Sequence, residues 1–119
     1  KENPEFMAKF VKVMAQADAA YRDNKAKWTA DSAEVKAIVK LVGGEPAEVP
    51  DVLALYGFPT LQEQASPRWL GGGAEGGAAK ALKFTSEFLK TEGRVDALQA
   101  DYGKFVTPAF AEAALKLGN

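Results

Sequence analysis

The chain has 119 residues, of which 47% are hydrophobic and 26% charged, and its 15 basic and 16 acidic residues leave a formal net charge of −1. This length suffices for one domain, and the composition is that of a globular protein. Because its charge is balanced, we expect the chain to lack the basic face that binding to nucleic acids or anionic membranes requires. Cysteine and histidine are both absent, which excludes disulfides, thiolate nucleophiles, zinc fingers, Ser-His-Asp triads and metal sites built on histidine.

No apolar run approaches the roughly 20 residues that a membrane-spanning helix needs, so we predict no membrane insertion. The chain opens at Lys1 with neither an initiator methionine nor a signal peptide. We therefore expect a mature or cleaved product.

Apolar residues at spacings of three and four predict two amphipathic helices in the first part of the chain. Asn3-Pro4 offers a cap followed by proline at the first helical position, and the first helix should fade near Asp23-Asn24. Three competing caps between residues 29 and 32 precede the second helix, which Gly43-Gly44 should end.

The middle of the chain, from Pro46 to Gly77, is rich in glycine, proline and aromatic residues and predicts loops with two short helices. The first short helix, punctuated by Pro46 and Pro50, should run through Val52, Leu53 and Leu55 to Tyr56. The second should follow Thr60-Leu61-Gln62-Glu63, which has the spacing of a capping box, and should close at Pro67.

Three further helices are predicted in the last part of the chain. A long one is expected from about Ala78 to Glu92, a shorter one through Val95, Leu98 and Tyr102, and a last one from Thr107-Pro108 until Gly118. No segment alternates cleanly as a strand would. The sequence therefore predicts an all-α chain of about seven helices, with residues 1–119 as one segment without an internal domain boundary.

The aromatic residues divide into two groups by their surroundings. Phe6, Phe10, Phe88 and Phe110 lie on apolar stripes and are expected in the core. Tyr56 and Trp69 lie in irregular segments beside glycine and proline, where an aromatic side chain can line a cleft or contact another domain.

A glycine cluster precedes the long helix, and Gly71, Gly73 and Gly76 spell the G-x-G-x-x-G pattern of dinucleotide-binding proteins. That pattern requires a buried strand before the glycines, whereas here Pro67 and polar residues come first. An anion-binding helix start is an alternative. We expect a plain flexible loop, with no cofactor.

Carboxylates form two clusters in the sequence, Glu45, Glu48 and Asp51 in one and Glu92 and Asp96 in the other. Paired carboxylates can act as acid and base in catalysis, but acids near helix ends more often stabilise those ends or face solvent. We expect a solvated surface, no metal site and no enzyme.

Several ordered motifs, which together cover almost the whole chain, resemble segments of the periplasmic solute-binding proteins for taurine and other sulfonates. They are Asn3–Phe6, Tyr56–Gln64, Trp69–Gly72, Ala78–Val95 and residues 101–107.

The resemblance implies a component of an ATP-binding-cassette (ABC) importer, located in the periplasm. Such proteins have two α/β lobes that close on a ligand, here a small anionic solute, and deliver it to an ABC permease. The chain resembles only about the last third, the C-terminal helical part of that two-lobed α/β fold, so the missing N-terminal part of the same protein is an expected partner. Tyr56 and Trp69 are the ligand-binding candidates. The alternative is an independent helical module that binds a partner protein.

Overall fold

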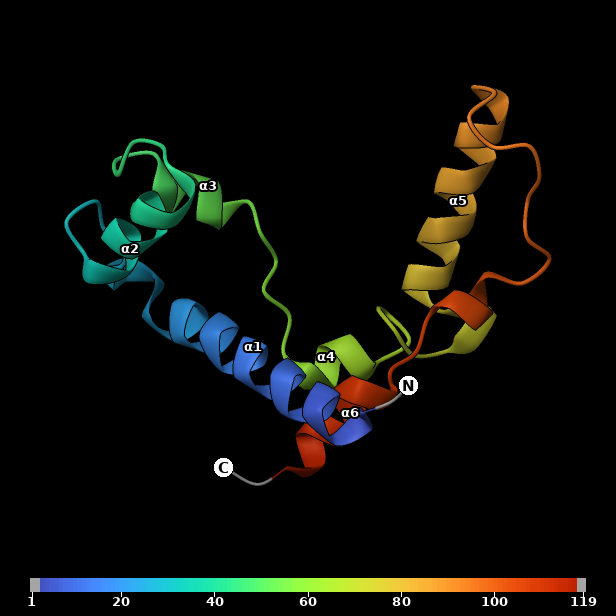
Figure 1. Cartoon of the computed structure of the whole chain (residues 1–119), viewed down its shortest axis with the longest axis horizontal. Helices are drawn as coiled ribbons and strands as arrows, with labels where there is room; N and C mark the ends of the chain where they lie inside the picture. The colour runs from blue at the N-terminus through green and yellow to red at the C-terminus, as the bar shows by residue number, and fades with distance from the viewer. Residues whose placement is uncertain (1–2, 118–119) are drawn as a thin grey trace. The chain divides into compact units, whose positions relative to one another are not determined.

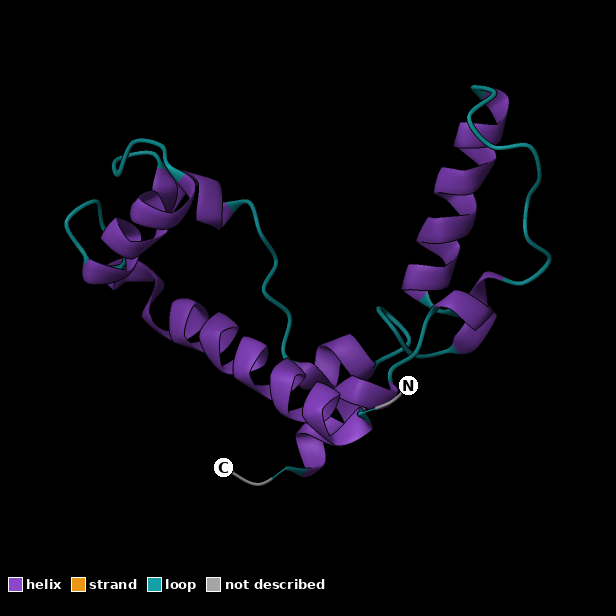
Figure 2. Ribbon diagram, viewed as in Figure 1, coloured by secondary structure: helices purple, strands orange, loops and turns teal. Residues whose placement is uncertain are grey.

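The computed structural model describes residues 3–117, and in that range the chain forms helices and loops without a strand (Figures 1 and 2). Its six α-helices are α1 (Pro4–Asn24), α2 (Ala33–Val42), α3 (Val49–Ala54), α4 (Leu61–Ala65), α5 (Gly77–Thr91) and α6 (Ala109–Lys116). Three short 3-10 helices accompany them: η1 (Lys25–Lys27), η2 (Gly73–Glu75) and η3 (Tyr102–Phe105). The all-α prediction is confirmed, with six α-helices where about seven were expected.

The chain divides into two compact units. The terminal unit comprises Lys1–Met14 with Pro59–Asn119, and the middle unit comprises Ala15–Phe58. Whether the whole chain unfolds as one domain depends on cooperativity, so the absence of a domain boundary in residues 1–119 stays a prediction.

The start of α1 and both ends of α2 lie where local capping residues direct them. The side-chain oxygen of Asn3 accepts a hydrogen bond of 2.9 Å from the Phe6 amide, which caps α1. Among the three competing caps of α2, Ser32 is the one used, since its hydroxyl accepts from the Val35 amide at 3.3 Å. Gly43 ends α2 with a φ of 81°, an angle that costs glycine little.

The capping box before α4 is present as predicted. The Thr60 hydroxyl accepts from the Glu63 amide at 3.2 Å, while a Glu63 carboxylate oxygen accepts from the Thr60 amide at 2.8 Å. The other short helix, α3, ends at Ala54, two residues before the predicted Tyr56.

The predicted helix through Val95, Leu98 and Tyr102 is wrong, because only its last residue is helical, as the start of η3. The Asp101 side chain accepts from the Gly103 amide at 2.8 Å, and the Tyr102 hydroxyl accepts from the Gln99 amide at 3.2 Å. These bonds use amides that an α-helix would pair with backbone carbonyls.

The last two helices follow the prediction closely. Helix α5 lies within one residue of its expected bounds, and α6 begins at Ala109. The predicted end of α6 at Gly118 lies outside the described residues. None of the helices in residues 3–117 combines the length and the apolarity needed to cross a membrane.

Each unit has its own small core. In the terminal unit α4 lies against α6, α5 contacts η2 and η3, and Lys12 on α1 donates to the Leu117 carbonyl (Figure 1). In the middle unit α2 contacts α3, and Val35 is fully buried. The buried apolar residues are small for the most part: Ala8, Tyr21, Val35, Ala79, Tyr102, Ala111 and Ala114.

The prediction that Phe6, Phe10 and Phe88 lie in the core is wrong for the described chain. Phe6 is 58% exposed and Phe10 is 50% exposed, and Phe88 on α5 is exposed as well. Phe110 is partly buried. The apolar stripes on α1 and α5 exist, but few described residues cover them.

Tyr21 is the aromatic centre of the middle unit. Its ring lies 5.1 Å from the Trp28 ring and 4.7 Å from the Phe58 ring, measured between centroids. The Tyr21 hydroxyl is buried and has no hydrogen-bond partner within residues 3–117. Burying an unpaired hydroxyl opposes folding, whereas burying the ring favours it.

We therefore expect Tyr21→Phe to keep or raise the free energy of unfolding, by up to about 1 kcal/mol, because it removes an unpaired polar atom. Tyr21→Ala should lower it by about 3 kcal/mol, because the whole ring is lost. Urea denaturation of the three proteins measures both changes. If Tyr21→Phe lowered the free energy of unfolding by about 1 kcal/mol or more, the Tyr21 hydroxyl would have a hydrogen-bond partner.

Candidate functional site

Tyr56 lies just after α3, in the middle unit, and its side chain is 64% exposed. Its amide donates to the Leu53 carbonyl at 3.1 Å, and its ring lies 5.9 Å from the Phe58 ring. Phe58 has a φ of 42°, in the left-handed region, and its carbonyl accepts from the Arg22 guanidinium at 2.9 Å. The loop that carries Tyr56 is thus held by its aromatic neighbour and by α1.

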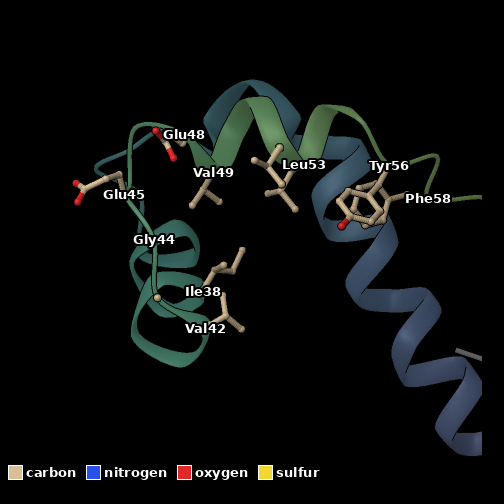
Figure 3. A pocket seen from close by; sticks show the side chains of 11 residues that line it. Ile38, Val42, Gly44, Glu45, Glu48, Val49, Leu53, Tyr56 and Phe58 are labelled. Atoms are coloured by element: carbon tan, nitrogen blue, oxygen red, sulfur yellow. The ribbon is translucent and has the colours of Figure 1, made fainter.

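A pocket of about 430 Å³ opens beside Tyr56, between α2 and α3 (Figure 3). Apolar side chains of the two helices point into it, and Figure 3 shows the aromatic rings at one end and two carboxylates at the other. Its main lining residues are Ile38, Val42, Val49 and Leu53, with Tyr56 and Phe58 at the aromatic end.

The charges at this pocket are acidic. Glu45 and Glu48 line it near the turn at Gly43-Gly44, and no lysine or arginine is among its lining residues in the described chain. Carboxylates repel anions, so these surroundings suit an apolar group better than a sulfonate.

Trp69 lies in the terminal unit and is 41% exposed. Its amide donates to the Ser66 carbonyl at 3.0 Å, and its own carbonyl accepts from the Ala78 amide, near the start of α5, at 2.8 Å. The backbone of Trp69 is therefore fixed on both sides.

A second hollow, of about 910 Å³, lies beside Trp69. It combines a cation, two hydroxyls and apolar groups from the segment before η2, from α5, and from η3 and the segment after it: Arg68, Trp69, Leu82, Thr85, Phe105 and Thr107. No described acidic side chain forms an ion pair with Arg68. A guanidinium with open donors beside hydroxyls can bind a small oxyanion, and the apolar groups can contact the rest of a solute.

Arg68 was missed by sequence reasoning, which selected Trp69 next to it. Its place in an irregular segment beside an aromatic residue was the available signal. Tyr56 and Trp69 lie in different units.

The glycine cluster is a packed turn, and the expectation of a plain flexible loop is wrong. The Gly77 amide donates to the Pro67 carbonyl and the Ala78 amide to the Trp69 carbonyl, both at 2.8 Å. These carbonyls occupy amides that an anion would need at the start of α5. A Cβ atom on Gly77 would overlap the Arg68 carbonyl oxygen, so the close approach of two backbones explains this glycine.

The two carboxylate clusters lie on the surface of the described chain, and Glu45 and Glu48 of the first cluster line the pocket beside Tyr56. Their five members are exposed, and residues 3–117 contain no group of acidic residues able to hold a metal ion. On α1, Lys9 donates to Glu5 at 2.6 Å and holds the pKa of that carboxyl below its usual value. A lowered pKa keeps a carboxyl ionised, the opposite of what a general acid needs.

No protein-family model matches the chain, and no solved structure matches it significantly. Among curated proteins, the chain is distantly similar to a periplasmic binding protein. This relative is the taurine-binding periplasmic protein of Escherichia coli (strain K12), which is 27% identical over 112 residues, or 94% of this chain. Those residues make up 33% of the relative, so the chain spans about a third of the length of the curated relative it matches.

The close approach of two backbones at Gly77 predicts how a substitution there changes stability. We expect Gly77→Ala to lower the free energy of unfolding by about 2 kcal/mol or more, because the added methyl group overlaps a backbone carbonyl. Gly57→Ala is the control, since nothing lies within 4 Å of a Cβ there. Thermal unfolding followed by circular dichroism compares the two, and equal melting temperatures would contradict the close approach at Gly77.

Proposed function

We propose that this chain is the C-terminal helical part of the substrate-binding component of an ABC importer, with taurine or a related aliphatic sulfonate as its solute. The observation that carries the proposal is the similarity to a taurine-binding periplasmic protein along 94% of the chain. A transport function of this kind needs selective, reversible binding and no bond-making chemistry, so the chain is not an enzyme in this proposal.

The exposed apolar stripes support a role as part of a larger protein. Phe6 and Phe10 stack at 6.3 Å between ring centroids on α1, and Phe84 and Phe88 are exposed on α5. Exposed apolar surface of this extent usually meets another protein surface. We propose that the N-terminal part of the same protein, which would supply the two-lobed α/β fold, covers these helices.

The hollow beside Trp69 supports an anionic solute. In this proposal Arg68 binds the sulfonate oxygens, which a guanidinium can do with two parallel hydrogen bonds, and Trp69 contacts the carbon chain. Tyr56 stays a candidate for the same role. Its acidic and apolar surroundings support that role less well.

A substrate-binding component of an importer works in the periplasm and hands its solute to an ABC permease in the membrane. The name of the curated relative describes that protein as periplasmic, which supports the same location for this chain.

Calorimetry with taurine tests the solute, using the full-length protein that contains this chain. We expect a heat of binding with taurine. Arg68→Gln should lower the affinity for taurine by about 10-fold or more, because a charged hydrogen bond is lost. Trp69→Ala should also weaken binding, and Tyr56→Ala tests the second candidate. Arg94→Gln, an exposed arginine outside the hollow, is the control and should change nothing. If neither taurine nor ethanesulfonate gave a heat of binding, the proposed solute would be overturned.

The chain of 119 residues alone separates this proposal from the alternative of an independent interaction module. As a part of a larger fold, it should bind a dye for apolar surfaces and self-associate, and Phe10→Ser should reduce both, since Phe10 is half exposed. Val35→Ser is the contrast, because it removes a fully buried side chain and should destabilise the chain. A monomeric chain with a cooperative melt and no dye binding would favour the module.

A further inference from the structure

We propose that the pocket between α2 and α3, named here the α2–α3 groove, is a docking site for an amphipathic helix of another protein that carries lysine or arginine near one end. This inference concerns the middle unit alone and is independent of the proposed solute.

The apolar residues of α3 and the turn after it favour a helical partner. Val49, Val52, Leu53 and Tyr56 follow one another at i, i+3, i+4 and i+7, the spacing of one face of a helix, and all four line the groove. Ile38 and Val42 of α2 line the opposite wall (Figure 3). Two helical stripes side by side leave a groove of about two turns, which a third helix fills with its own apolar stripe.

The groove is open to such a partner in the described chain. Val42 is 78% exposed, and Val52 and Tyr56 are exposed too, although each lines the groove. A volume of about 430 Å³ is large enough for several apolar side chains. Covering these residues removes apolar surface from water, which is the main driving force for helix-in-groove binding.

The charge of the groove selects a basic partner. Glu45 and Glu48 lie at the end near the Gly43-Gly44 turn, opposite Tyr56 and Phe58 (Figure 3). The sequence has no lysine or arginine from residue 41 to residue 67. A helix with lysine or arginine at that end therefore meets carboxylates without a competing cation from this stretch, and an acidic helix is repelled.

A labelled synthetic peptide tests the proposal by fluorescence anisotropy. The probe is a helical peptide of about 14 residues, with leucines at helical spacing, glutamines elsewhere and two lysines at its C-terminal end; a matched peptide has glutamates for the lysines. We expect the chain to bind the basic peptide about 5-fold or more tightly than the acidic one, and added salt to reduce the difference.

Matched variants locate the binding. Val42→Ser should weaken binding about 10-fold, because Val42 lines the groove. Leu41→Ser is its control, since Leu41 is 83% exposed on the same helix and does not line the groove. Glu45→Gln with Glu48→Gln should remove the preference for the basic peptide, and Glu34→Gln should not. The charge variants keep the test valid if Val42→Ser impairs folding.

Several outcomes would overturn the proposal: no binding of either peptide, equal binding of both, or equal effects of Val42→Ser and Leu41→Ser. The same titration with the full-length protein is decisive for the occupant. Binding there supports an external helix, whereas loss of binding would show that the protein's own chain fills the groove.

Discussion

The shortage of large buried side chains limits the folding free energy of this molecule. Val35 is the largest side chain that is completely buried in the described chain, and alanine provides four of the seven buried apolar residues. Burial of large apolar side chains is the main source of folding free energy, and fixing the backbone opposes it at every residue. The caps at Asn3, Ser32 and Thr60 set where helices begin, but each contributes only about 1 kcal/mol. A covering surface supplied by a larger protein would account for this balance, which is why the exposed stripes of α1 and α5 bear on function.

Backbone contacts partly compensate for the small side chains in the terminal unit. The carbonyls of Pro67 and Trp69 accept from the first amides of α5, and glycine at position 77 allows that approach. The same contacts fix Trp69 and place Arg68 beside it on the surface. Gly77, which directly follows the glycine pattern that resembles a nucleotide-binding motif, therefore lets a helix and a loop pack together.

Sequence reasoning succeeded where the determinants are local. The start of α1, the ends of α2 and the capping box of α4 each depend on residues a few positions apart, so they could be read from the chain. The stripe with Phe6 and Phe10 shows which face of α1 is apolar, but periodicity does not reveal whether anything covers that face. The predicted helix through Val95 failed because the hydrogen bonds of Asp101 and Tyr102 depend on side-chain geometry. Arg68 was missed for a related reason, since the absence of an ion-pair partner within the described residues is a property of the folded chain.

Phe58 shows how two requirements can meet at one position. Its left-handed backbone angle, directly before Pro59, would be most easily adopted by glycine or asparagine, whereas its ring is needed against Tyr21. Arg22 holds the carbonyl of the same residue. No standard amino acid meets both requirements well, so the range of residues tolerated at this site should be narrow. In a set of related sequences, position 58 would then vary together with positions 21 and 22 rather than alone.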